Sequence, residues 1–156
     1  LDEAEYSITR IGFDLMMEER WDLALKVFDF ATSIPTNLFS SESDKLRHII
    51  NLSLCQKKVD GEKECEKVLN DIDWSSKRSK FRLAANVLRE NYDQASTIME
   101  DVSENDVSKY AYKNWPLFDE FRKSEEFRSC YEGKFGVKFQ EDYEKEDVLI
   151  ENTNSD

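Results

Sequence analysis

Side chains suited to nucleophilic or metal chemistry are few in this chain of 156 residues. The single histidine is His48, and the three cysteines are Cys55, Cys65 and Cys130. A Cys–His catalytic pair needs its two side chains in contact, but His48 and Cys55 are seven residues apart, or about 10 Å along a helix axis. One histidine also excludes a site built from several histidines. We therefore expect no catalytic residues, no metal ion, no cofactor and no enzymatic activity.

Other patterns that carry chemistry are absent or unspecific. Phosphate-binding loops need closely spaced glycines, and only Gly133 and Gly136 lie within four residues of each other. The cysteines show no C-x-x-C spacing, and their odd number is a poor basis for a disulfide framework. We interpret them as reduced, buried, small hydrophobic residues, which is typical of a cytoplasmic protein.

The composition of the chain limits both its fold and its partners. Only 4 Gly and 2 Pro occur, too few turn formers for an all-β sandwich or barrel. There are 34 acidic and 22 basic residues, for a net charge of −12, whereas nucleic-acid backbones attract basic surfaces. No run of about eighteen apolar residues is present, so no membrane-spanning segment is expected.

The acidic excess is concentrated near the end of the sequence. Residues 141–156 contain seven acids and one base, Lys145, a composition typical of solvated, disordered chain. We divide the sequence into a helical domain, 1–138, and an acidic, disordered tail, 139–156. The tail either keeps the protein soluble or regulates it, by binding a partner or by competing for the protein's own binding groove.

Apolar residues recur at helical spacing along most of the chain, and no alternating stretch is long enough to build a sheet. Short turns separate the apolar stripes, at Glu18–Arg20, Asp60–Gly61 and Asn91. Pro35 ends the second stripe, because proline disfavours helical geometry in the residue before it. Ser41 and Asp44 resemble a capping box at the start of the third helix. The pattern predicts an all-α protein of antiparallel helical hairpins.

The second helices of three hairpins share a pattern of residue sizes. In each, a small residue is followed by a bulky one and then by a further apolar one, at positions i, i+4 and i+7. The triplets are Ala24, Phe28 and Ala31; Cys65, Leu69 and Ile72; and Ala95, Met99 and Val102. A small residue lets two helices approach closely, and the bulky one fills the groove beside it. Because a single hairpin cannot bury its own apolar face, neighbouring hairpins are expected to stack.

This repeat resembles the tetratricopeptide repeat family over about residues 4–103. The first copy carries most of the resemblance, through Ile8, Ile11, Gly12, Leu15, Ala24, Phe28, Ala31 and the turn aromatic Trp21. The small residues Ala24, Cys65 and Ala95 are 41 and 30 positions apart, against a family period of about 34. The resemblance implies a tetratricopeptide-like α-solenoid of about three hairpins.

The segment after the repeats is similar to the short helix pair that closes many bacterial arrays of this family. It comprises Trp115–Phe118 and Phe121–Tyr131, with Gly133 and Gly136 ending the second helix. Terminal units of a repeat array must cover the apolar face of the last repeat. We therefore expect a C-terminal capping helix pair.

In the tetratricopeptide family the first helix of each hairpin lines a concave face that binds extended peptides. The resemblance implies these partner-binding residues: Tyr6, Thr9, Phe13 and Met17; Arg47, Ile50, Leu54, Lys57 and Lys58; and Arg82, Asn86 and Arg89. Members that bind chaperone tails carry Lys and Asn where this chain has Thr9 and Phe13, so that activity is not expected. Alternatively, the apolar members are core residues and the basic ones form a solvated helix face.

Aromatic, Met and basic side chains together suit adaptable apolar contact and recognition of carboxylates. We therefore predict a non-enzymatic protein–protein interaction module that binds an acidic, partly hydrophobic protein or peptide segment in a concave groove. Neither nucleic acid nor a membrane is an expected partner. The alternative is a regulatory or assembly domain of a larger enzyme or sensor, which the start at Leu1 instead of Met suggests.

Overall fold

The structure of this chain is a computed structural model that describes residues 2–35 and 41–140. All regular structure within those two ranges is helical, which confirms the all-α prediction. The α-helices are α1 (Asp2–Met17), α2 (Trp21–Ser33), α3 (Glu42–Asp60), α4 (Glu62–Asn70), α5 (Ser79–Leu88), α6 (Tyr92–Asp101), α7 (Lys109–Asn114) and α8 (Glu125–Phe135). The short 3-10 helices within the same two ranges are η2 (Trp74–Ser76), η3 (Pro116–Phe118) and η4 (Phe121–Lys123).

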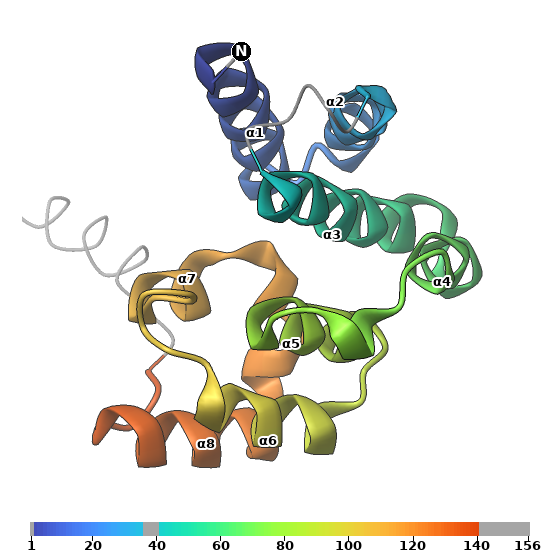
Figure 1. The fold of residues 1–156 in the computed structure, drawn as a ribbon. Coiled ribbons are helices and arrows are strands. Elements are labelled where there is room, and N and C mark those ends of the chain that lie inside the picture. Colours follow the sequence, from blue (N-terminus) through green and yellow to red (C-terminus); the bar gives the residue numbers. More distant parts are fainter. Residues whose placement is uncertain (1, 36–40, 141–156) are drawn as a thin grey trace, which may run out of the picture.

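Successive helices joined by short turns pack against each other, as α1 with α2, α3 with α4, and α5 with α6 (Figure 1). The turns lie where the sequence predicted them, at 18–20, at Gly61 and at 89–91. The long helix α3 also packs on α2 and on α5, while α6 packs on α8. In this arrangement α3 joins the first hairpin to the C-terminal half of the molecule.

The predicted size triplets lie in the core. Ala24 and Ala95 have no exposed surface and Cys65 is 2% exposed, and all three bulky partners, Phe28, Leu69 and Met99, are fully buried. Of the third members, Ala31 and Val102 are buried and Ile72 is half-buried. The second helix of each hairpin therefore presents its small residue to the interior, as helix packing at close approach requires.

Gly12 shows how closely α1 and α2 approach each other. A Cβ atom added to Gly12 would lie 2.4 Å from Cζ of Phe28. Phe28 has no exposed surface, so its ring has little room to move away. The absence of a side chain at position 12 is what permits the Phe28 ring to pack against the α1 backbone.

The start of α3 has the predicted cap. The Ser41 hydroxyl accepts a hydrogen bond from the backbone N–H of Asp44 at 3.2 Å, and it also donates to the Asp44 carboxylate. One of the N–H groups left unpaired at a helix start is satisfied in this way. Ser108 and Ser124 cap α7 and α8 similarly.

The C-terminal segment differs in part from the predicted helix pair. In place of the first predicted helix, Trp115–Phe118, there is the single 3-10 turn η3, and Pro116, after an extended Trp115, cannot continue α7. The predicted second helix, Phe121–Tyr131, is divided by an extended Ser124 into η4 and α8. Helix α8 runs through Gly133 and ends at Gly136 in the left-handed conformation, with φ +67°. The expectation that Gly133 also ends this helix is wrong.

Aromatic rings hold the C-terminal segment together. Neighbouring ring centroids lie 4.7 to 6.5 Å apart in a cluster formed by Tyr112, Trp115, Phe118, Phe121, Phe127, Tyr131, Phe135 and Phe139. Such pairs add to the stabilisation that burial of apolar area provides. Phe139, which the sequence analysis assigned to the tail, packs on Phe127 and Tyr131. Gln140 is exposed, and residues 141–156 of that tail lie outside the described residues.

Among the described residues, no helix combines the length and the apolar character that crossing a bilayer would require.

Candidate interaction surface

The predicted groove residues of α1 differ in their exposure. Tyr6 is 67% exposed and Met17 is 48% exposed, so both are available to a partner. Phe13 is half-buried and packs against the core. Thr9 is half-buried, with its hydroxyl 2.7 Å from Nε2 of the buried His48 on α3. Thr9 and Phe13 therefore help to attach α1 to the rest of the molecule.

The apolar groove residues predicted on α3 belong to the core. Ile50 has no exposed surface, and Leu54 is 4% exposed. Helix α3 is covered by α2 on one side and by α4 and α5 on others, so little of its apolar surface reaches solvent. For Ile50, and largely for Leu54, the alternative interpretation as core residues is correct.

The predicted basic residues of α3 are engaged in different ways. Arg47 Nη1 lies 3.3 Å from a carboxylate oxygen of Asp44, on the same helix. Lys57 Nζ donates to the carbonyl of Leu88 at 2.8 Å and to Glu90 at 2.6 Å, so it links α3 to the end of α5. Lys58 Nζ lies 5.5 Å from the ring centroid of Trp21.

The predicted residues of α5, and Arg89 directly after it, are held by hydrogen bonds. Arg89 forms a bidentate ion pair with the Glu66 carboxylate, and it also donates a hydrogen bond to the side chain of Asn70 at 3.1 Å. Glu66 and Asn70 both belong to α4. Asn86 donates to the carbonyl of Arg82 at 2.8 Å. Arg82 donates to the Ser79 hydroxyl at 3.2 Å, and its buried Nε has no partner within the described residues.

The basic charges of the predicted groove are thus largely matched by carboxylates of the chain itself. Arg47, Lys57 and Arg89 each have an acidic partner. The more exposed pairs of Arg47 and Arg89 contribute only about 0–1 kcal/mol, so a carboxylate of a bound segment can replace their internal partners at small cost, whereas Lys57 is largely enclosed. Arg47, Arg82 and Arg89 line neither of the two hollows described below.

A hollow of about 330 Å³ lies where α3, α5 and η3 meet, and we name it the α3–α5 hollow. Its lining is Leu54, Lys57, Lys58, Gly61, Glu62, Val87, Leu88, Glu90, Tyr92, Pro116, Leu117 and Glu120. The apolar members form a floor, since Leu54, Val87, Leu88 and Leu117 are all buried. The charged members, two lysines and three glutamates, surround that floor. Of the predicted groove residues it includes Leu54, Lys57 and Lys58.

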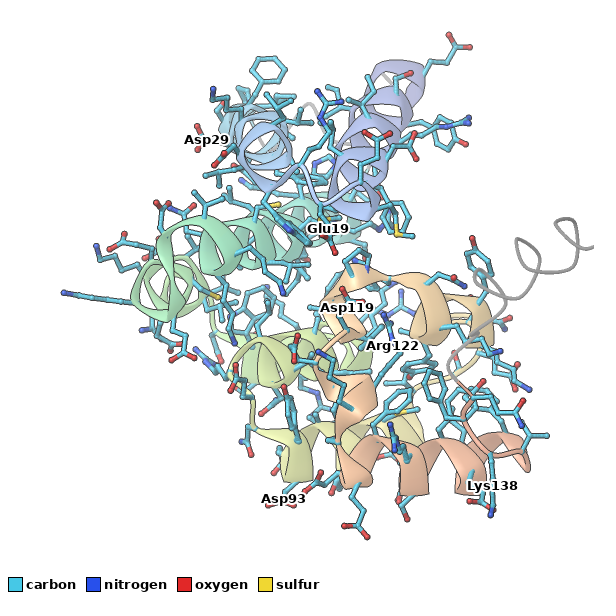
Figure 2. All side chains as sticks on the ribbon, turned by 180° about the vertical axis from the view of Figure 1, so that it is seen from behind. Glu19, Asp29, Asp93, Asp119, Arg122 and Lys138 are labelled. Carbon is cyan, nitrogen blue, oxygen red and sulfur yellow. The ribbon has the colours of Figure 1, made fainter. Side chains whose placement is uncertain are left out.

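A second hollow of about 500 Å³ adjoins the first through the shared Lys58. It is lined by Glu19, Arg20, Trp21, Asp22, Leu23, Lys58 and Val59. Figure 2 shows Glu19 on the turn between α1 and α2, and Asp119 on the segment that follows η3. Lys58 therefore stands between a hollow at the α1–α2 turn and the α3–α5 hollow.

The charges around the α3–α5 hollow affect one another. A hydrogen bond from Lys123 is the main reason why the pKa of Glu120 lies below its usual range, and Lys58 and Lys57 add to that effect. Burial raises the pKa of Asp119, although Arg122 and Lys58 oppose the rise. Burial, reinforced by Glu90 and Glu120, raises the pKa of Tyr92 to about 12. The phenol of Tyr92 therefore remains neutral at physiological pH.

The residues that could have carried chemistry are buried apart from this surface. Burial raises the pKa of Cys55 to about 12 and that of Cys65 to about 11, which suppresses the reactive thiolate. His48 is 1% exposed and contacts Thr9 and Phe28. Within the described ranges, no three His, Cys, Asp or Glu side chains converge to hold a metal ion.

The part of the hollow that α5, α6 and η3 supply was not predicted from the sequence. Tyr92 follows the predicted turn at Asn91, and Pro116 and Leu117 belong to the predicted closing segment. Their positions in the sequence were recognised, but their closeness to α3 was not. The aromatic residue at the start of α6 is the one signal that could have suggested it, because Trp21 stands at the same place in the first hairpin.

No protein-family model, no curated protein and no solved structure matches this chain.

Proposed function

We propose that this chain is a non-enzymatic, tetratricopeptide-like interaction module that binds a segment of another protein at the α3–α5 hollow. The hollow itself is the observation that carries the proposal. Its lining combines a floor of aliphatic side chains with two lysines and three glutamates. Apolar floors with a few charged groups at the rim are typical of sites that bind a side chain and orient its neighbours.

The tetratricopeptide-like part of the proposal is supported by the spacing and burial of the size triplets. Ala24, Cys65 and Ala95 are all buried at the positions where that family places small residues. The pairing of α1 with α2, α3 with α4 and α5 with α6 agrees with an array of hairpins. Such arrays generally serve as binding surfaces for other proteins.

The partner segment that fits the hollow has an apolar residue next to a carboxylate. The apolar side chain would contact Leu88 and Leu117, and the carboxylate would reach Lys58, the lysine that both hollows share. Lys57 is already bound to Glu90 and to the Leu88 carbonyl, so it serves mainly to fix the wall of the hollow.

Selection from a random peptide library displayed on phage tests the proposal. We expect enrichment of sequences with a Leu, Ile or Phe beside Asp or Glu, and loss of that acidic preference in the variant Lys58→Glu. Lys63→Glu is the matched control, because Lys63 is an exposed residue of α4 that does not line the hollow. The proposal fails if no peptide is enriched, or if both charge reversals change the selected sequences equally.

A further inference from the structure

An apolar face of the first hairpin is not covered by any other described residue, and only its edge residue Leu23 also lines the second hollow, beside the proposed peptide site. On α2, Leu23 is 39% exposed and Phe30 is 61% exposed, with the half-buried Val27 between them. On α1, Ile11 is 54% exposed and Leu15 is half-buried. We call these five residues the α1–α2 outer face. Single exposed apolar residues are common, but a contiguous group of them indicates an interaction site.

The two stripes lie on the same side of the hairpin, opposite α3. Thr9 of α1 and Phe28 of α2 both contact His48 of α3. Residues two positions apart on an α-helix point about 200° away from each other. Because Thr9 points toward α3, Ile11 points away from it. In the same way Phe28 points toward α3 and Phe30 points away from it.

The order of residues on α2 is suited to pairing with a copy of itself. Leu23, Val27 and Phe30 follow the i, i+4, i+7 spacing of one helix face. When two α2 helices lie antiparallel about a two-fold axis near Val27, Leu23 of each copy stands opposite Phe30 of the other. A two-fold interface requires such self-complementarity, and it places a smaller side chain against a larger one twice.

Charges beside the stripe match the same register. Lys26 and Asp29 are exposed on the flank of α2, and neither makes an ion pair with any described residue. Figure 2 shows Asp29 projecting outward from α2. A two-fold axis near Val27 would bring Lys26 of each copy within about one helical turn of Asp29 of the other along the helix axis, which would allow two intermolecular ion pairs.

Helix α1 fits this arrangement as well. Gly12 packs on Phe28, so α1 and α2 are aligned with Ile11 near the level of Phe30 and Leu15 near the level of Leu25. The same axis then places Ile11 of one copy nearly opposite Leu15 of the other, offset by about one residue along the helix. We propose that the α1–α2 outer face is the interface of a symmetric homodimer, with the two hairpins packed antiparallel.

Sedimentation equilibrium of the full chain at several protein concentrations tests this proposal. We expect the mass of a dimer at high concentration and dissociation on dilution. Phe30→Glu places two charges in the interface of each dimer and is expected to raise the dissociation constant about a hundred-fold or more. Tyr110→Glu is the control, because Tyr110 is 72% exposed on α7, outside the outer face. Its dissociation constant is expected to remain that of the unmodified chain.

Charge exchange tests the antiparallel register. Lys26→Glu alone and Asp29→Lys alone are both expected to weaken the dimer, and the double variant is expected to restore it. All these positions are exposed, and helical circular dichroism establishes that each variant is folded. The proposal is overturned if the chain is a monomer at every concentration, or if Phe30→Glu leaves the dimer unaffected. It is also overturned if the double variant binds no more tightly than the single variants. A chain that is monomeric but uses this face to bind a different protein overturns it as well.

Discussion

At the scale of single residues, burial determines what the polar side chains can do. Lys57 was predicted to meet a partner, yet it is largely enclosed and fixed by Leu88 and Glu90. Lys58, its neighbour in sequence, stands at the junction of two hollows. Residues one apart on a helix point about 100° apart, and this difference separates a structural lysine from one that can bind.

The three thiols provide a direct test of burial. Because burial raises the pKa of Cys55 to about 12, from 9.0, its thiolate fraction at pH 8 falls by about a thousand-fold. We expect slow modification of all three cysteines by iodoacetamide in the folded protein and rapid modification in urea. Cys130 is expected to react first, since it is 9% exposed. Rapid labelling of Cys55 in the folded chain would show that the core assignment is wrong.

Asp106 connects the segment after α6 to the start of α5 and makes stability depend on pH. Its carboxylate lies 2.7 Å from Arg78 and 3.5 Å from Lys80, and Ser103 donates to it at 3.1 Å. Desolvation is the largest single influence and acts upward, but Ser103, Arg78 and Lys80 together outweigh it and lower the pKa of Asp106 from 3.8. The folded state therefore binds this proton more weakly than the unfolded state.

The stabilisation by Asp106 is consequently complete above pH 4 and is lost as the pH falls through the lowered pKa. Asp106→Asn is expected to lower the free energy of unfolding by about 0.5–1 kcal/mol at pH 7, the range of exposed pairs, and to have less effect at pH 2. Urea unfolding at both pH values measures this. Asp101→Asn, at an exposed carboxylate without an ion pair to any described residue, is the control. Equal losses at both pH values would contradict the assignment.

At the scale of elements, the contact between α1 and α2 depends on one missing side chain. Gly12→Ala places a methyl group against the buried Phe28 ring and is expected to destabilise the protein by about 1–3 kcal/mol. Gly133→Ala is the matched control, because Gly133 is also helical but a Cβ there meets no atom within 4 Å. It is expected to stabilise by about 0.5–1 kcal/mol through helix propensity alone.

Thermal or urea unfolding of the two glycine variants gives the comparison. If contact with the Phe28 ring causes the loss, Gly12→Ala should destabilise the protein less when Phe28 is already replaced by Leu than when Phe28 is present. Similar gains in stability for Gly12→Ala and Gly133→Ala would mean that α1 does not pack on Phe28 as described.

Local patterns predicted the helices, their turns and the small residues of each hairpin, because those features depend on spacing within one segment. The cap at Ser41 and the burial of Ala24 and Ala95 are examples. The hollow was not predictable in the same way, since Tyr92 and Leu117 reach α3 only through tertiary packing. Nor could the sequence indicate that Glu66 and Glu90 neutralise the basic residues across helices.

At the scale of the whole molecule, the two proposed binding surfaces have separate places. The α3–α5 hollow lies where α3, α5 and η3 meet, whereas the outer face lies on the side of α1 and α2 that is turned away from α3 (Figure 1). A homodimer through the outer face would leave the α3–α5 hollow of each copy accessible. Two copies of the hollow in one particle would increase the apparent affinity for a partner that carries two binding segments.

Methyl NMR of the chain with a peptide from the phage selection tests the central claim most directly. If the peptide binds the α3–α5 hollow, the methyl signals of Val87, Leu88 and Leu117 shift on titration, while those of Ile11 and Ile72, which line neither hollow, remain in place. Shifts confined to the second group, or no shift with a peptide that binds, would contradict the proposal that this hollow is the binding site.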